Sequence, residues 1–283
     1  MNQIRNVPIG AGAEWLLGGF ALLRRAPLAL GTLGLLWGAL SALVAVSGMV
    51  WLNLVMFLLG PILLGGLIYA AREVDLGRRA EPGHLLQGPR EGKVPHLLAM
   101  LLPQIAALLV LALLAMVLFG AEQLQQMALV IQQMQTNPDP ALASTLPAGR
   151  MLAWLALAIV VGILAGFFTF VAIPEVMFTA TGPFAAMATS LRACLRNLGA
   201  IIVLIVLLFI AVVAISIAVQ LVVLLLAWAT GPQPAMVVGQ LLTTAVLMPI
   251  MAGTFYCAWK HMVGGGLAQA SPVTADAAGG FEA

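Results

Sequence analysis

The feature that most constrains this chain is the stretch between Arg196 and Lys260, which contains no charged side chain. Hydrocarbon offers the peptide backbone no hydrogen-bonding partner, whereas an α-helix satisfies its own backbone groups, so a stretch of this kind is typical of membrane-spanning helices. Crossing about 30 Å of hydrocarbon takes about 20 apolar residues. The stretch is long enough for two crossings and therefore predicts a pair of membrane helices.

The composition of the whole chain fits the same environment. Of its 283 residues, 63% are hydrophobic and only 8% are charged, whereas a soluble domain has about 25% charged residues. A water-soluble fold of this size would lack the charged side chains that cover a surface. The formal net charge of +2 is too small to favour a nucleic-acid partner.

Four long uncharged segments contain most of the apolar residues, and two of them are long enough to cross the membrane twice. We split these two at Ser47–Gly48 and at Gly231–Pro234, because glycine and proline interrupt helices. The sequence thus predicts an all-α polytopic bundle of six transmembrane helices, with residues 1–262 as one integral-membrane domain and 263–283 as a disordered cytoplasmic tail. The expected spans are residues 28–47, 51–71, 94–121, 151–174, 199–228 and 236–259.

The basic residues indicate the orientation of these spans. Of the 12 lysines and arginines, only Arg150 falls in a loop that follows an odd-numbered span, which leaves the other eleven on the opposite side. Loops rich in lysine and arginine stay in the cytoplasm when a chain is inserted into a membrane. We therefore expect both termini to be cytoplasmic.

The cysteines and histidines predict neither a disulfide nor a metal site. Cys194 and Cys257 both fall near the cytoplasmic side, which is reducing. His84, His96 and His261 lie on the same side, and their spacing does not match a set of metal ligands. No cofactor is expected.

The six spans are interpreted as three pairs that form a threefold two-helix repeat. The second span of each pair carries a proline in its cytoplasmic half, at Pro61, Pro174 and Pro249. Pro61 and Pro249 are each followed by isoleucine and, four residues after the proline, by Gly65 and Gly253. Parallel repeats of this kind occur in some transporters, but they also occur in proteins that transport nothing.

A short amphipathic helix is expected before the first span and another before the fifth. Their apolar faces consist of Leu16, Phe20 and Leu23 in one and of Met187, Leu191, Cys194 and Leu198 in the other. The segment before the third span is basic but is broken by Gly88 and Pro89. Basic amphipathic helices lie in the headgroup layer of a membrane. Four arginines are expected to face anionic phospholipid there: Arg24, Arg25, Arg192 and Arg196.

A motif near the start of the chain reads Trp15-x-x-x-Gly19-Phe20-x-Leu22-Leu23-Arg24-Arg25-x-Pro27-Leu28. It resembles the opening of a family of bacterial inner-membrane proteins of unknown function. The six-span layout is also similar to the membrane region attached to some glycerophosphodiester phosphodiesterases. The resemblance implies a helical bundle in the bacterial inner membrane with cytoplasmic termini. It implies no catalytic residues, because the family has no assigned chemistry and the phosphodiesterase barrel is absent from this sequence.

Glu175 is the most prominent candidate for a functional residue, because an ionisable side chain within a membrane helix is a functional hypothesis by default. It follows Pro174, whose missing N–H group leaves a backbone carbonyl unpaired and favours polar neighbours. One interpretation is a proton or cation site. The other is a carboxylate at the membrane interface that is hydrated or paired with Arg192 or Arg196.

Other residues in and between the spans have two interpretations each. Gln104 and Gln220 either belong to a polar site with Glu175 or hydrogen-bond neighbouring helices. Four prolines that should kink their helices either create hinges and cavities or shape a packed bundle: Pro61, Pro103, Pro174 and Pro249. Two Gly-x-x-x-Gly pairs allow close helix approach within one chain or between two chains: Gly34 with Gly38, and Gly162 with Gly166. The glutamine-rich segment 121–150 is predicted to contain an amphipathic helix that acts as a lid, binds a partner or lies on the membrane surface.

These observations favour a non-enzymatic protein of the bacterial inner membrane that interacts with lipid or scaffolds partner proteins. The sequence contains no phosphate-binding loop, nucleophile elbow or zinc-protease motif. A small transporter or channel that uses Glu175 is the alternative, and an intramembrane hydrolase is a more distant one. Anionic phospholipid is the expected partner.

Overall fold

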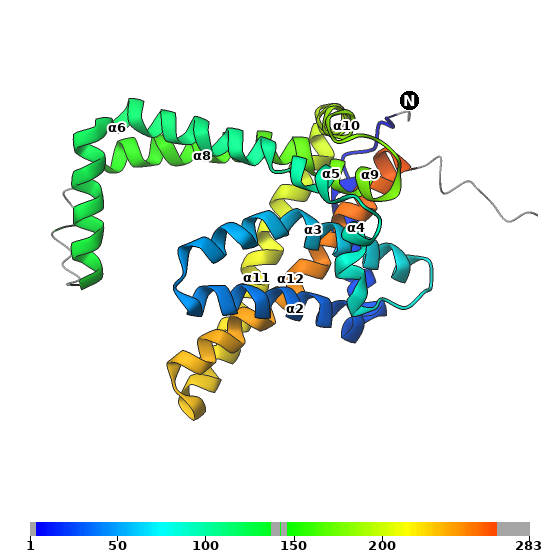
Figure 1. Cartoon of the computed structure of the whole chain (residues 1–283), viewed down its shortest axis with the longest axis horizontal. Coiled ribbons are helices and arrows are strands. Elements are labelled where there is room, and N and C mark those ends of the chain that lie inside the picture. The colour runs from blue at the N-terminus through cyan, green and yellow to red at the C-terminus, as the bar shows by residue number, and fades with distance from the viewer. Residues whose placement is uncertain (1–3, 137–141, 143–145, 265–283) are drawn as a thin grey trace, which may run out of the picture.

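The computed structural model describes residues 4–136, 142 and 146–264, and among these residues it contains helices and no β-strand (Figure 1). Six helical segments are long and apolar enough to cross a membrane, which confirms the predicted all-α polytopic bundle. Residues 265–283 of the predicted tail lie outside the described residues. The long helices are α2 (Pro27–Ser47), α3 (Val50–Asp75), α6 (Leu102–Thr136), α8 (Ala148–Thr169), α11 (Leu198–Thr230) and α12 (Pro232–Met262).

Shorter helices gather at one end of the molecule. They are α1 (Ala11–Arg25), the 3-10 helix η1 (Pro82–Leu86), α4 (Gln87–Arg90), α5 (Val94–Ala99), α9 (Ala172–Phe178) and α10 (Pro183–Arg196). The break predicted before the third span is therefore present, since three short helices occupy that segment. This end of the molecule carries every lysine and arginine of the chain except Arg150, and we call it the basic end.

The long helices pair into three hairpins, α2 with α3, α6 with α8 and α11 with α12, as the sequence predicts. Gly48 and Gly231 form the turns of the first and third hairpins with φ angles of 65° and 88°. Only glycine adopts such angles without strain, so these residues fix where the two hairpins turn. In Figure 1 the three hairpins start from the basic end and spread apart away from it.

α12 is the central helix and contacts α1, α2, α3 and α11. Glycines on two of these partners permit a very close approach. A Cβ atom added to Gly34 of α2 would lie 2.8 Å from the carbonyl oxygen of Thr244, and one added to Gly19 of α1 would lie 2.5 Å from that of Ile250. Both distances are shorter than a van der Waals contact. The predicted close approach of helices at Gly34 and Gly38 is therefore confirmed, within one chain.

The short helices pack in a cyclic order. α1 contacts α12, the group of η1, α4 and α5 contacts α3, and α10 contacts α8. The short helices before the second and third hairpins therefore pack against the second long helix of the hairpin that comes before them in the chain. α1, which comes before the first hairpin, packs in the same way against the second long helix of the third hairpin. Three copies of one unit around a common axis would pack in this way, so the arrangement supports the predicted repeat.

α1 is packed more deeply than the sequence predicts. Trp15 and Leu22 lie at the centre of its buried side, whereas Phe20 and Leu23 of the predicted apolar face are only half-buried. Trp15 donates a hydrogen bond from Nε1 to Nδ1 of His261 at 3.2 Å. The hydrophobic pattern misses this side because the glycines that let the backbone of α1 approach α11 and α12 do not count as apolar residues.

A serine from α10 explains the break between α8 and α9. Pro174 has no N–H group, so the helix cannot continue regularly through the preceding turn. The Oγ atom of Ser190 accepts a hydrogen bond from the N–H group of Val171 at 3.0 Å and donates one to the carbonyl oxygen of Phe167 at 2.7 Å. The side chain thus bridges two backbone groups that would bond each other in an unbroken helix.

The four prolines expected to kink their helices divide into two kinds. Pro103 and Pro174 lie in the first turn of α6 and of α9, directly after interruptions of the helix, so the predicted bends are present there. Pro61 and Pro249 lie inside α3 and α12, which continue through them. Proline is tolerated in a first turn because its missing N–H group would be unpaired there anyway.

α6 also bends at Gly120, where φ is 73° and ψ is 164°. Beyond this bend the chain continues as a helix to Thr136, which confirms the first part of the amphipathic helix predicted for 121–150. Arg150, in the first turn of α8, donates a hydrogen bond from Nη1 to Oε1 of Gln123 at 2.7 Å. The start of α8 is therefore tied to the segment that follows the bend.

We predict that Ser190→Ala destabilises the protein by about 1–3 kcal/mol, because it leaves the N–H group of Val171 and the carbonyl of Phe167 unpaired in a buried place. Thermal or denaturant unfolding of the purified protein in detergent measures this loss. Ser47→Ala is the control, since Ser47 bonds only backbone groups beside it at the end of α2, and we expect a change within about 0.5 kcal/mol. Equal losses in the two variants would contradict the role given to Ser190.

Candidate functional site

The three hairpins meet at the basic end through α3, α12 and the short helix α9 that follows α8. α3, α9 and α12 contact one another there and bring together residues that lie far apart in the sequence. Two carboxylates and three aromatic side chains form this region. We call it the junction and define it by Asp75, Glu175, Phe178, Tyr256 and Trp259.

Glu175 is buried, with 2% of its surface exposed. Trp259 of α12 donates a hydrogen bond from Nε1 to Oε2 of Glu175 at 2.6 Å, and Thr181 donates one from Oγ1 to Oε1 at 3.3 Å. Arg192 and Arg196, the partners suggested by the sequence, are exposed on α10. The carboxylate is therefore enclosed by the protein, which contradicts the interpretation of Glu175 as a hydrated carboxylate.

Aromatic side chains connect Glu175 to the rest of the junction. The ring centroid of Phe178 lies 4.9 Å from that of Trp259 and 6.0 Å from that of Tyr256. The guanidinium carbon of Arg72 lies 4.8 Å from the Phe178 centroid, which is the geometry of a cation–π interaction. Since the rings belong to α9 and α12 and the cation to α3, this set of contacts joins all three hairpins.

Asp75 is the second carboxylate of the junction and was not singled out by the sequence. Its Oδ2 atom accepts hydrogen bonds from the hydroxyl of Tyr256 at 2.8 Å and from Nζ of Lys260 at 2.6 Å. Nη1 of Arg25 lies 3.9 Å from Oδ1. A charged residue at the end of a span is ordinary, which is why it was missed. The four-residue spacing of Tyr256 and Lys260, which puts both on one helix face, is the signal that indicates a shared partner.

The contacts of the junction are of a kind that holds helices together. Its carboxylates accept hydrogen bonds from donors on other elements, and removal of one donor from a buried carboxylate is costly. Within the described ranges, no group of three or more His, Cys, Asp or Glu side chains is placed to hold a metal ion. The arrangement can hold three hairpins at fixed relative positions.

The polar set predicted around Glu175 is not assembled. Gln104 lies on α6 and donates a hydrogen bond from Nε2 to Oγ1 of Thr169 on α8 at 3.4 Å. Gln220 is exposed in the half of α11 that lies away from the basic end. Of the two interpretations for Gln104, the structure supports a hydrogen bond between neighbouring helices.

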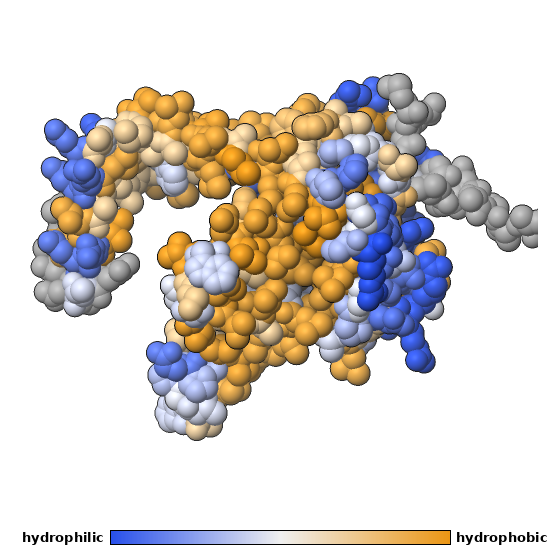
Figure 2. Space-filling model, viewed as in Figure 1, coloured by the Kyte–Doolittle hydropathy of each residue, from blue (hydrophilic) through white to orange (hydrophobic). Residues whose placement is uncertain are grey.

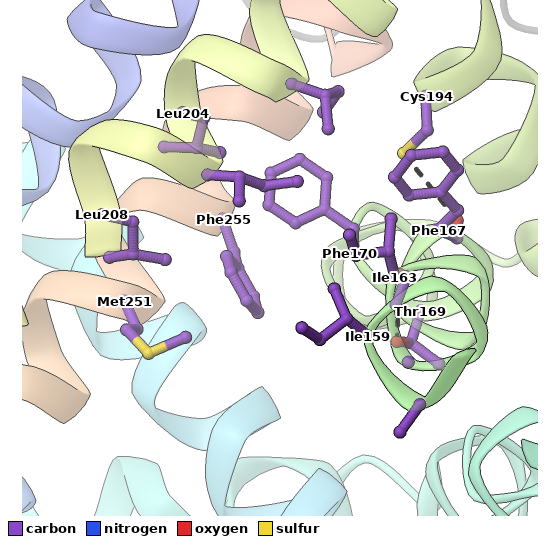
Figure 3. Close-up of a pocket in the computed structure, with 15 residues that line it drawn as sticks. Ile159, Ile163, Phe167, Thr169, Phe170, Cys194, Leu204, Leu208, Met251 and Phe255 are labelled. Carbon is purple, nitrogen blue, oxygen red and sulfur yellow. Dashed lines mark hydrogen bonds between the residues drawn. The ribbon is translucent and has the colours of Figure 1, made fainter. Parts of the chain in front are cut away.

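An apolar cleft of about 400 Å³ lies between α8 and the α11–α12 hairpin (Figure 3). Figure 3 shows Ile159 and Ile163 of α8 on one side and Leu204 and Leu208 of α11 on the other, with Phe255 of α12 between them. The rings of Phe170 and Phe255 pack edge to face, with centroids 4.9 Å apart, and join α8 to α12. None of the residues that line the cleft is charged.

Gly162 and Gly166 lie on the α8 wall of this cleft. No heavy atom lies within 4 Å of a Cβ atom placed at either glycine. Close approach of a helix of the same chain at this pair is therefore wrong, because α8 packs on α6 and α10 instead. The space that the two glycines leave stays open.

The α6–α8 hairpin stands apart from the other two hairpins. Figure 2 shows apolar surface on both sides of the gap between them. In the most apolar part of the span 94–134 only 6% of the residues are buried, compared with 44% for the span 50–75. Most of this hairpin is therefore available to the surrounding lipid.

The four arginines expected to contact anionic lipid are all exposed at the basic end: Arg24, Arg25, Arg192 and Arg196. Arg25 has a distant acidic neighbour, Asp75. The other three make no hydrogen bond or ion pair with any residue that the structure describes. Their charges are therefore free to interact with ligands outside the chain.

We predict that Trp259→Phe destabilises the protein by about 1–3 kcal/mol, because it removes a hydrogen-bond donor from the buried carboxylate of Glu175. Adding Glu175→Gln should recover part of this loss, since the double variant no longer buries a carboxylate that has lost one of its hydrogen-bond donors. Unfolding in detergent gives the loss of stability in the single and the double variant, and with Glu175→Gln alone it gives the coupling energy between the two positions. Trp228→Phe is the matched control, because Trp228 is 90% exposed. Equal losses of stability in Trp228→Phe and Trp259→Phe would show that the hydrogen bond to Glu175 does not stabilise the protein.

No protein family, curated protein or solved structure matches this chain. The family resemblance of the motif that starts at Trp15 stays a prediction. The function of the protein is therefore inferred from the junction, the cleft and the distribution of charge.

Proposed function

We propose that this chain is a non-enzymatic lipid-binding protein of the bacterial inner membrane. The observation that supports this most directly is the apolar cleft between α8 and the α11–α12 hairpin. All three helices belong to membrane spans, so the cleft opens into hydrocarbon and not into water. Acyl chains are the ligands whose chemistry fits walls of isoleucine, leucine, phenylalanine and methionine.

The size and lining of the cleft suit this ligand. Small-molecule pockets measure about 300–1,000 Å³ and are mostly apolar, and the cleft has about 400 Å³. Because no charged residue lines it, a charged headgroup would remain outside. The hairpins meet at the basic end, where exposed arginines can interact with an anionic headgroup.

We further propose that the basic end faces the cytoplasm and that both termini are cytoplasmic. Eleven of the 12 lysines and arginines support this orientation. The cytoplasmic leaflet carries anionic lipid, which attracts such a surface. The resemblance of the opening motif to bacterial inner-membrane proteins supports the same location.

Transport is the alternative, and one observation favours it. Glu175 is a buried carboxylate directly after a break in a span, which is a common setting for a proton or cation site. Its oxygens, however, accept hydrogen bonds from Trp259 and Thr181, and the cleft is not lined by it. A transport pathway would need a hydrated route to this residue. The lipid-binding proposal needs no change in the structure.

We predict that Gly162→Leu combined with Gly166→Leu lowers the amount of lipid retained by the purified protein, because the new side chains fill the cleft. The fold should persist, since no atom lies within 4 Å of either site and glycine is the weaker helix former by roughly 0.5–1 kcal/mol per residue. Native mass spectrometry counts the lipid molecules that remain bound.

Gly60→Leu combined with Gly149→Leu is the matched control for the cleft variant. These glycines also have no atom within 4 Å of an added Cβ atom and lie in helices outside the cleft. We expect lipid retention to stay at the level of the unmodified chain. If the cleft variant also retains as much lipid as the unmodified chain, the proposed function fails.

We predict that Leu129→Cys reacts with a membrane-impermeant maleimide in intact spheroplasts, whereas Leu86→Cys reacts only after the membrane is permeabilised. The two leucines are 59% and 51% exposed, so burial does not block either site. Each cysteine is introduced into a variant in which the native Cys194 and Cys257 are replaced by alanine, so that only the introduced thiol can react. Labelling of both positions from the same side of the membrane would contradict the proposed orientation.

A further inference from the structure

A second pocket lies at the basic end, apart from the cleft. It is a groove of about 800 Å³ between the α1–α2 turn and the end of α3. Arg25, Arg78 and Arg79 line it together with Asp75, while Leu28 belongs to its apolar part. We call it the arginine groove.

The end of α3 explains how two of these arginines reach the groove. Gly77 has a φ angle of 74° and donates its N–H group to the carbonyl of Val74 at 3.1 Å. The N–H group of Arg78 returns to the carbonyl of Glu73 at 2.8 Å. These two bonds form a Schellman ending, which stops the helix and reverses the chain. The reversal places Arg78 and Arg79 beside the end of α1.

The acidic side chains at the groove already have cationic partners. Arg78 donates two hydrogen bonds to the carboxylate of Glu73, one of them from Nη2 to Oε1 at 2.6 Å. These hydrogen bonds raise the pKa of the Arg78 guanidinium above its usual value. Asp75 accepts hydrogen bonds from Tyr256 and Lys260. The negative charges of Glu73 and Asp75 therefore have partners other than Arg25 and Arg79.

Arg25 and Arg79 supply the charge that remains. The side chain of Arg25 is 63% exposed, and its contact with Asp75 is long at 3.9 Å. Arg79 is exposed and makes no hydrogen bond or ion pair with any residue in the described part of the chain. The groove therefore keeps two positive charges whose hydrogen-bond donors are free.

An exposed apolar stripe leads from the groove along α2. Leu28 is 83% exposed within the groove, and Leu35 and Val46 are 41% and 78% exposed further along the helix. With 3.6 residues per turn, these residues lie about two and five turns beyond Leu28 on the same side. Since α2 is long and apolar enough to span a membrane, this stripe lies where lipid tails run.

We propose that the arginine groove binds the phosphate group of an anionic phospholipid, with Arg25 and Arg79 as hydrogen-bond donors and an acyl chain along the Leu28 stripe. The planar fork of a guanidinium matches the oxygens of a phosphate group. A free phosphate would use the same donors but would leave the stripe without a ligand, so the lipid is favoured. This inference rests on the proposed function because both require lipid bound to the chain, but the groove and the cleft are separate sites.

The test compares two double variants that each remove two positive charges at the basic end. One is Arg25→Gln with Arg79→Gln, and the control is Arg5→Gln with Arg90→Gln, two exposed arginines that do not line the groove. Arg78 is left in place because its loss would leave the buried carboxylate of Glu73 unpaired. Purified protein in neutral detergent is titrated with dioleoyl phosphatidylglycerol, dioleoyl phosphatidylcholine or inorganic phosphate. The half-maximal concentration for thermal stabilisation reports the affinity of each.

We expect the groove variant to bind phosphatidylglycerol about tenfold or more weakly, since each arginine near a lipid surface contributes appreciably to the attraction. The control should change by less than about threefold, because a general surface charge is screened by salt. Equal weakening in both variants, or no weakening in either, would overturn the proposal. Stabilisation by inorganic phosphate at the same concentrations as by phosphatidylglycerol would identify a free phosphate as the ligand and overturn the lipid assignment.

Two further measurements separate this proposal from folding defects and from the proposed function. Leu28→Gln keeps both arginines, so it should weaken phosphatidylglycerol binding and leave inorganic phosphate unaffected; unchanged phosphatidylglycerol binding would exclude the stripe. If the groove variant does not fold, Arg79→Gln alone replaces it, because Arg79 has no hydrogen bond or ion pair to lose among the residues that the structure describes. Lipid retention by the Gly162 and Gly166 variant reports on the cleft alone, so either site can fail without the other.

Discussion

Lipid tails are as apolar as the helices they surround, so helices in a membrane are held together by close packing and buried hydrogen bonds. α12 meets this condition through Gly19 of α1 and Gly34 of α2, which let two backbones touch it directly. The first and third hairpins therefore form one packed unit around α12. The cyclic packing of the short helices at the basic end completes that unit.

The second hairpin shows what happens without such contacts. Gly162 and Gly166 have the same spacing as Gly34 and Gly38, but no helix lies against them. α8 is attached at its end near the basic end, where Ser190 bridges its last turn to α10. The cleft is the direct result, because the same pair of small residues gives a tight contact beside a partner and an open space without one.

The sequence predicted the six spans and the turns at Gly48 and Gly231 because hydropathy and helix breakers are local properties. It could not predict which helix faces touch, since an almost uniformly apolar helix such as α11 has no polar side that marks its orientation. The Gly-x-x-x-Gly motif was therefore a correct guide to packing within the chain at Gly34 and a wrong one at Gly162. Glu175 was found because it is isolated in an apolar segment, whereas its partner Trp259 comes from another hairpin and could not be identified.

The junction and the cleft share the second hairpin, and this relation bears on lipid binding. Glu175 holds α9 against α12 through Trp259, and separating them would remove a hydrogen-bond donor from a buried carboxylate. The break that Ser190 bridges lies between α8 and α9, so the junction is on one side of it and the α8 wall of the cleft is on the other. The contact of Phe170 with Phe255 closes one end of the cleft, and the space beside Gly162 and Gly166 stays open. The proposed acyl chain fits such a site better than a rigid ligand does, because a flexible chain can follow the open space along Gly162 and Gly166.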